Sequence, residues 1–200
     1  MSSETYNPAE YWNMREHPNT AAAPDINVHD RQFITPILEE AKSVLELGPG
    51  VGRLFPLYKN VPRVATVDLS RNYADRAKDA ALNVGISVEA FYLDTPLAPL
   101  PFMAGEFDVG IAAHVLMHVP FENIEHSMSE LARVCKQVRV ISVVHRFWPK
   151  KGTRFDPKWH CFNHDYEAIC KSLNLQFGDY EKFSEGADIG SFGFSFRLNS

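Results

Sequence analysis

The sequence has few cysteines, no long apolar run and no excess of positive charge. Three cysteines in 200 residues are too few and too irregularly spaced for a disulfide framework, and they fit a reducing compartment. No apolar stretch reaches the ~18 residues of a membrane span, and the first residues lack the pattern of a signal peptide. A formal net charge of −5 disfavours a nucleic-acid partner. We therefore expect a cytoplasmic protein without membrane or nucleic-acid partners, whose oligomeric state the sequence leaves open.

Apolar segments that suit strands alternate with helical segments along most of the chain. Strands are expected at 44–47, 64–67, 86–93, 107–113 and 138–144, and helices at 51–58, 71–83 and 122–135. Further helices follow Asp30 and Asn163, two residue types that commonly cap helices. Segments 175–183 and 191–198 read as an antiparallel hairpin. The alternation predicts an α/β fold. It would be a Rossmann-like open twisted sheet, mostly parallel, with that hairpin at one edge and helices on both faces.

The first 29 residues differ from the rest of the chain. They are polar and carry Pro8, Pro18 and Pro24, which disfavours a strand. We expect residues 1–29 to form an arm or lid over a ligand site, and residues 30–200 to form one domain. Two hundred residues suit a single hydrophobic core.

A glycine-rich turn follows the first expected strand. Gly48, Gly50 and Gly52 alternate with other residues directly after Glu46-Leu47. Glycines without Cβ atoms let the backbone bend tightly and let a ligand approach the main chain. In open α/β sheets, the first strand-to-helix turn is where a nucleotide-like cofactor binds. The spacing is G-x-G-x-G, whereas nicotinamide enzymes use G-x-G-x-x-G.

Acidic residues end the next two expected strands, Asp68 in the segment 64–70 and Asp94 after the third strand. Together with the turn at 46–52 and the block 107–120, they resemble, in order, the motifs of class I S-adenosylmethionine-dependent methyltransferases of the small-molecule type. The resemblance implies an S-adenosylmethionine site formed by Glu46, Gly48, Gly50, Gly52, Asp68, Leu69, Asp94 and Thr95, with Trp12 and Arg15 from the arm.

The resemblance also implies a role for each of these side chains. Asp68 would accept hydrogen bonds from both ribose hydroxyls, and Asp94 with the backbone of Thr95 would bind the adenine amino group. Glu46 would orient the amino group of the cofactor. Arg15 would pair with the methionine carboxylate.

Two histidines are candidate bases for a proton transfer. His145 directly follows the fifth expected strand and is the first candidate, and His114 at the end of the fourth is the second. A structural role for His145 is equally compatible with its position. No metal site is expected. Although His114 and His118 are four apart, they do not lie on an expected helix. The later group matches no standard zinc spacing: His160, Cys161, His164 and Cys170.

The function expected from these features is transfer of a methyl group from S-adenosylmethionine to an oxygen or nitrogen of a small molecule. A non-catalytic subunit that binds S-adenosylmethionine is the alternative. A nicotinamide-dependent oxidoreductase is disfavoured by the glycine spacing.

Overall fold

A computed structural model describes residues 6–14, 26–145, 155–156, 160–185 and 189–199 of the chain. The helices are α1 (Pro8–Met14), α2 (Val28–Leu38), α3 (Arg71–Asn83), α4 (Ile124–Val134) and α5 (Tyr166–Ser172), with 3₁₀ turns η1 (Phe55–Tyr58) and η2 (Leu116–His118). The strands are β1 (Ser43–Leu47), β2 (Arg63–Asp68), β3 (Glu89–Tyr92), β4 (Phe107–Ala113), β5 (Cys135–His145), β6 (Phe155–Asp156), β7 (Cys161–Phe162), β8 (Leu175–Glu185) and β9 (Ile189–Leu198).

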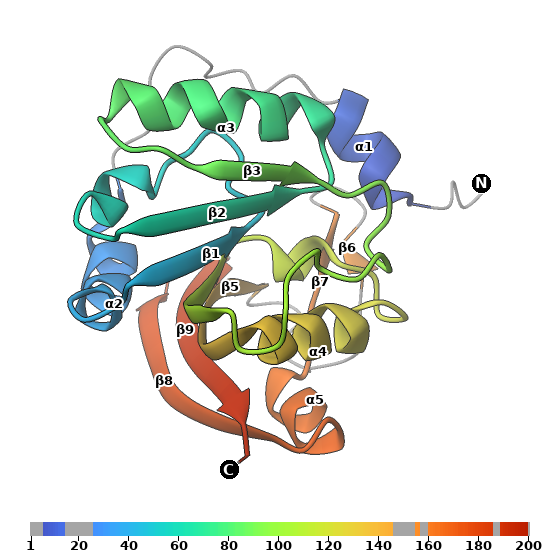
Figure 1. The fold of residues 1–200 in the computed structure, drawn as a ribbon. Coiled ribbons are helices and arrows are strands. Elements are labelled where there is room, and N and C mark those ends of the chain that lie inside the picture. Colours follow the sequence, from blue (N-terminus) through green and yellow to red (C-terminus); the bar gives the residue numbers. More distant parts are fainter. Residues whose placement is uncertain (1–5, 15–25, 146–154, 157–159, 186–188, 200) are drawn as a thin grey trace.

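One seven-stranded sheet organises the fold, in the order β3-β2-β1-β4-β5-β9-β8 (Figure 1). Strands β1 to β5 pair in parallel, whereas β9 pairs antiparallel with both β5 and β8. The sequence prediction of a mostly parallel sheet with an antiparallel hairpin at one edge is confirmed. The strand order reverses between β1 and β4, and in such sheets that point forms a crevice at the carboxyl ends of the strands.

Helices cover both faces of the sheet, and each face has its own hydrophobic cluster. One cluster joins α2, η1 and α3 to the sheet, and the other joins α4 and α5 to the opposite face. Val44 and Leu45, neighbours in β1, lie in different clusters because successive side chains of a strand point to opposite faces. This two-sided burial explains why the parallel strands are nearly continuous apolar runs.

Two helix caps differ from the sequence prediction. The side chain that caps α2 is Asn27, which accepts a hydrogen bond from the backbone of His29, and Asp30 lies inside the first turn. At α5 the cap is Asp165, which accepts from the backbone of Ala168, and Asn163 lies before it. Each helix has two capping residues in sequence near its start, and propensity alone does not decide between them.

The helix expected at 51–58 is also wrong. After the glycine turn the chain forms only turns and the short 3₁₀ segment η1. Gly50 and Gly52 have φ values of 54° and 76°, outside the α-helical region, and Pro56 lacks a backbone donor. The third strand is shorter than the expected 86–93 and begins at Glu89.

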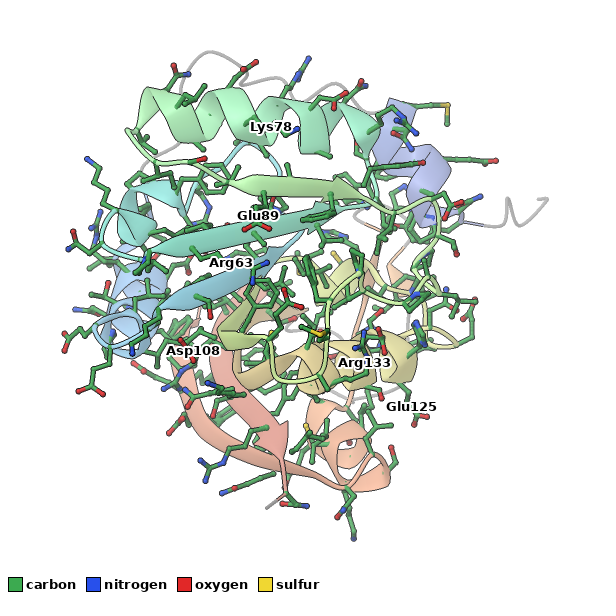
Figure 2. All side chains as sticks on the ribbon, in the orientation of Figure 1. Arg63, Lys78, Glu89, Asp108, Glu125 and Arg133 are labelled. Atoms are coloured by element: carbon green, nitrogen blue, oxygen red, sulfur yellow. The ribbon has the colours of Figure 1, made fainter. Side chains whose placement is uncertain are left out.

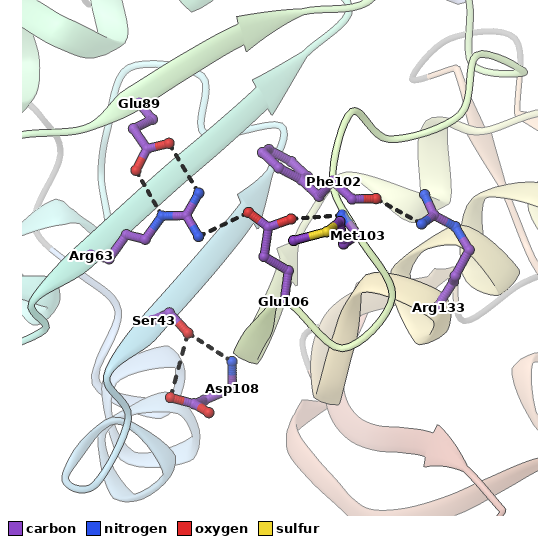
Figure 3. A network of polar contacts seen from close by, with 8 residues as sticks. All are labelled: Ser43, Arg63, Glu89, Phe102, Met103, Glu106, Asp108 and Arg133. Atoms are coloured by element: carbon purple, nitrogen blue, oxygen red, sulfur yellow. Dashed lines mark hydrogen bonds and ion pairs between the residues drawn. The ribbon is translucent and has the colours of Figure 1, made fainter.

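A network of charged residues joins the amino ends of the parallel strands, away from the crevice. Arg63 of β2 binds Glu89 of β3 through Nε at 2.7 Å and Glu106, before β4, through Nη1 at 2.9 Å (Figures 2 and 3). A second arginine, Arg133 of α4, donates to the carbonyls of Leu100 and Phe102. This second contact matters for the site, because it holds the loop between β3 and β4 against α4.

Candidate active site

A cavity of about 520 Å³ lies at the carboxyl ends of β1, β2 and β4. The arrowheads of β1 to β3 in Figure 1 point toward this side of the molecule, where α1 also lies. The walls of the cavity include residues from the glycine turn, the end of β2, the loops after β3 and β4, and α1. The volume is in the usual range for a small-molecule or cofactor site, about 300–1,000 Å³.

The three glycines of the turn do not serve one purpose. All three have positive φ, which favours glycine at each position. A Cβ on Gly48 would lie 2.5 Å from Val115 Cγ2, and a Cβ on Gly52 would lie 2.5 Å from the ring of Phe55. A Cβ on Gly50, which lines the cavity, would have nothing within 4 Å. Gly50 is therefore the glycine that leaves space open for a ligand, whereas the spaces left by the other two are filled by the protein.

Asp68 ends β2 and places a nearly buried carboxylate in the cavity wall. Its Oδ1 accepts a hydrogen bond of 2.8 Å from the backbone of Ser70. Burial raises the pKa of Asp68 to about 6, although hydrogen bonds from the backbone of Ser70, Gly50 and Leu69 act to lower it. The remaining acceptor capacity of this carboxylate suits a ligand that brings hydroxyl donors.

Glu46 lies within β1 and is buried, but it is not one of the residues that line the cavity. Burial raises its pKa to about 7, against the lowering effects of Tyr58 and Arg53 and with a further increase from Asp68. Its Oε2 and the Tyr58 hydroxyl have no hydrogen-bond partner of regular geometry in the described residues.

Asp30, Arg53 and His114 meet on another part of the cavity wall. Asp30 Oδ2 lies 2.6 Å from Arg53 Nη1 and 3.3 Å from His114 Nε2. Burial alone would raise the pKa of Asp30, but the hydrogen bonds and charges of His114 and Arg53 hold it below its ordinary value. The three side chains come from α2, the turn after β1 and the end of β4.

The arm helix α1 closes one side of the cavity. Pro8 and Trp12 line it, and the Trp12 ring packs edge-on against His118 at 5.0 Å between centroids. Asn13 fixes the helix to the site, because its Nδ2 donates to the carbonyl of Leu69 and its Oδ1 accepts from the backbone of Arg71. These two hydrogen bonds therefore hold α1 against the segment that follows β2.

The structure brings only some of the site residues expected from sequence to the cavity. Gly48, Gly50, Asp68, Leu69, Trp12 and His114 line it, as does Leu93. Gly52, Asp94 and Thr95 are not lining residues, and Asp94 is exposed. The side chain of His145 and all of Arg15 lie outside the described residues. The roles assigned to these residues stay predictions.

Sequence reasoning missed Arg53 and Asn13. Arg53 directly follows the glycine turn, but its partner Asp30 is 23 residues away, and no local pattern marks the pair. Asn13 lies within the expected arm beside Trp12, yet its two contacts are 56 and 58 residues away. Pairings over such separations depend on the tertiary fold.

Two further histidines contact main-chain carbonyls. His118 Nδ1 donates to the carbonyl of His160 at 2.9 Å, and His164 Nε2 donates to that of Val119 at 2.9 Å. Within the described ranges, no group of three or more His, Cys, Asp or Glu side chains is arranged to hold a metal ion. The helices in the same ranges are all too short or too polar to cross a membrane.

Comparison with known sequences gives one family and one curated relative. Residues 45–140 match the family model described as a methyltransferase domain. A phosphatidylethanolamine N-methyltransferase of Cereibacter sphaeroides is 30% identical over 109 residues, which cover 54% of this chain and 53% of the relative. The chain thus spans about half the length of this relative.

Comparison with solved structures shows the same fold at low sequence identity. A geranyl diphosphate C-methyltransferase from Streptomyces coelicolor, solved with Mg²⁺, geranyl diphosphate and S-adenosyl-L-homocysteine, gives a TM-score of 0.71 at 14% identity. The match covers 96% of each chain. A methyltransferase described as S-adenosylmethionine-dependent from Aquifex aeolicus gives 0.60 at 15% identity, over 84% of this chain and 89% of that one. At sequence identities this low, the similarity shows a shared fold and nothing further.

Proposed function

We propose that the chain is a class I S-adenosylmethionine-dependent methyltransferase that transfers a methyl group to an oxygen or nitrogen of a small molecule, and the match of residues 45–140 to a methyltransferase domain supports this proposal. The observation that carries the proposal is the pairing of Asp68 with Gly50 at the cavity. A buried carboxylate with spare acceptor capacity faces a turn whose missing Cβ leaves open space. A ribose with two hydroxyls fits that pair of features.

The residues of the cavity suit S-adenosylmethionine. Asp68 would hold the ribose hydroxyls, while Leu69, Leu93 and Val115 supply apolar walls that suit the adenine ring. When bound, this cofactor supplies an activated methyl group on a sulfonium. The protein's own tasks are then to align the acceptor and to exclude water.

The relatives differ in the type of acceptor that their names give, and the side chains of the cavity favour one type. The curated relative is named for N-methylation of phosphatidylethanolamine, and a structural neighbour is named for C-methylation of geranyl diphosphate. We favour an oxygen or nitrogen acceptor, because the cavity holds histidines and carboxylates that suit a nucleophile bearing a proton. A cytoplasmic location and the absence of a nucleic-acid partner remain predictions from composition.

Two measurements test the proposal. Calorimetry of the purified protein is expected to give micromolar binding of S-adenosylmethionine and S-adenosylhomocysteine and no binding of NAD. Turnover is then measured with a labelled methyl donor and a panel of a phenol, a carboxylic acid, ethanolamine, phosphoethanolamine and phosphatidylethanolamine vesicles. Heat with NAD alone would contradict the cofactor assignment. Cofactor binding without transfer to any acceptor would favour a non-catalytic subunit.

We also propose that residues 1–29 act as a lid. Deletion of residues 1–20 is expected to leave a folded domain, because neither hydrophobic cluster includes any of residues 6–14, the part of this segment that the structure describes. Cofactor affinity should fall, and Trp12→Ala alone should weaken it about tenfold, since partial burial of an aromatic ring contributes about 1–2 kcal/mol. Met14→Ala, which alters an exposed residue of the same helix, is the control. Unchanged affinity in the truncated protein would show that the arm is incidental.

A further inference from the structure

Asp30 and His114 form a contact that neither the family match nor the proposed function assigns. They are 84 residues apart in sequence and meet at the cavity, where Asp30 Oδ2 lies 3.3 Å from His114 Nε2. Because a carboxylate accepts hydrogen bonds, this geometry places the proton of a neutral imidazole on Nε2. The lone pair is then on Nδ1, for which the described residues supply no partner.

Burial and two favourable electrostatic interactions hold the Asp30 side chain in place. It is only 2% exposed, and a buried carboxylate must be compensated by partners. Arg53 Nη1 supplies the opposite charge at 2.6 Å, and the first turn of α2 supplies the favourable end of a helix dipole. The carboxylate is therefore held in place independently of its contact with His114.

His114 is held by its backbone as well as by its ring. Its φ of 58° is in the left-handed region, which is uncommon for a residue other than glycine. A hydrogen bond of 2.8 Å from its backbone N–H to the carbonyl of Ile141 fixes it to β5. Strained residues of this kind concentrate at functional sites, where the surrounding structure maintains them.

We propose that His114 is the base that accepts the proton of the methyl acceptor, and that Asp30 is the residue that positions it. The inference rests on the proposed function. The acceptor's lone pair forms a bond to the methyl carbon, the carbon–sulfur bond breaks with its electron pair moving to sulfur, and the acceptor's proton passes to His114 Nδ1. Asp30 then faces an imidazolium, while Arg53 balances the carboxylate when His114 is neutral. The other ionisable side chains of the cavity wall are Asp68, Tyr73, His118, His126 and Glu130.

This assignment differs from the order expected from sequence, in which His145 comes first. The described geometry supplies His114 with an orienting carboxylate at the cavity. His145→Gln therefore serves as a comparison in the same experiments.

The first experiment observes the ring of His114 in the protein without any ligand. Nitrogen-15 spectra that report both ring nitrogens are recorded for the wild type and assigned with His114→Gln. In the neutral form of the ring, we expect Nε2 to bear the proton and Nδ1 to be bare, and Asp30→Asn to redistribute the proton between the two nitrogens. Asp108→Asn is the matched control, since it removes a carboxylate bonded to Lys136 outside the cavity and should leave these signals unchanged. A proton on Nδ1 and none on Nε2 in the wild type would overturn the proposal.

The second experiment compares turnover with the best acceptor of the panel. His114→Gln is expected to lower kcat by about 10²–10⁴-fold and to remove the acidic limb of the pH–rate profile. Asp30→Asn should lower kcat at least about tenfold with little change in cofactor affinity, and adding it to His114→Gln should cause no further loss, because the two residues act as a unit. The double variant Asp30→Asn/Arg53→Gln, which keeps the charge balanced, separates a loss of folding from a loss of positioning.

Three outcomes count against the inference. The first is wild-type turnover in Asp30→Asn. The second is additive effects of the two substitutions in the Asp30→Asn/His114→Gln double variant. The third is a large loss of turnover in His145→Gln with no loss in His114→Gln. If the wild type methylates no acceptor of the panel, the proposed function fails. The nitrogen-15 spectra still decide whether Asp30 orients His114.

Discussion

Asp68→Ala is expected to weaken S-adenosylmethionine binding by about 2–4 kcal/mol, or about 30- to 900-fold, the scale for losing one partner of a desolvated, charge-assisted hydrogen bond. The fold should survive, because Asp68 ends a strand at the cavity and belongs to neither hydrophobic cluster. Calorimetry measures the affinity, with Asp79→Ala, an exposed carboxylate on α3, as the control. Normal binding by Asp68→Ala would remove this residue from the site.

The raised pKa of Asp68 adds a pH dependence to the same prediction. With a pKa of about 6 in the free protein, the carboxylate that accepts the ribose hydroxyls is protonated below that pH. Cofactor affinity should therefore fall about tenfold per pH unit below pH 6, and Asp68→Asn should lose this dependence. A wild-type affinity that stays constant from pH 7 to pH 5 would contradict it.

The raised pKa of Asp68 affects the stability of the fold in the opposite direction: stability falls as the pH rises, whereas cofactor affinity rises. A folded-state pKa above the ordinary value of 3.8 means that the folded protein binds the proton more tightly than the unfolded chain. Asp68 therefore destabilises the fold increasingly as the pH rises from about 4 to about 6, and that cost persists at neutral pH. At pH 8, the free energy of unfolding of Asp68→Asn is expected to exceed that of the wild type by about 1–3 kcal/mol, as measured by denaturant unfolding. Loss of binding with a gain in stability is typical of a residue retained for function.

Gly50→Ala is expected mainly to lower cofactor affinity, whereas Gly52→Ala is expected mainly to lower the stability of the fold. Both positions have positive φ, so alanine costs about 1–2 kcal/mol at each. At Gly52 the added Cβ also meets the buried ring of Phe55 at 2.5 Å, which should raise the loss of stability to about 2–5 kcal/mol. At Gly50 the Cβ meets no protein atom within 4 Å and lies at the cavity, so cofactor affinity should fall instead.

A third glycine supplies the control for backbone strain. Gly85 follows α3, has a φ of 79° and leaves open space, but it does not line the cavity. Gly85→Ala should therefore show the strain cost alone, with normal cofactor binding. Thermal unfolding and calorimetry on the three variants make the comparison. If Gly50→Ala binds as well as Gly85→Ala, the open space at Gly50 is not part of the ligand site.

The sheet was predictable from sequence because its signals are local. Segments such as Phe107–Ala113 are apolar runs between polar stretches, and Arg71–Asn83 has both helical periodicity and a glycine after its end. The segment 51–58 was not predictable as a 3₁₀ turn, because its apolar spacing also suits a helix. What excludes the helix is the backbone of Gly50 and Gly52, whose φ values depend on the folded turn.

The positions of Asp68 and Gly50 at the cavity were predictable from sequence, whereas the cluster of Asp30, Arg53 and His114 was not. Asp68 ends β2 and Gly50 lies in the turn after β1, so the sequence places both at the carboxyl edge of the sheet. Asp30 reads as a helix cap in sequence, yet in the structure it binds Arg53 and His114, and only the packing of α2 against the sheet brings the three together. Gly52 carries the same sequence signal as Gly50, but its free space is occupied by Phe55.

The position of β9 in the sheet has a consequence for how the chain is made. β9 follows β8 in sequence but lies between β8 and β5, with both of which it pairs. While the ribosome has yet to release residues 189–198, β5 has an open edge and β8 has no neighbour through which to join the sheet. An unpaired edge of this length is a template for wrong pairing with other chains. A nascent chain stalled before β9 should therefore bind chaperones and resist compaction, whereas one that has released β9 should close its sheet in a single cooperative step.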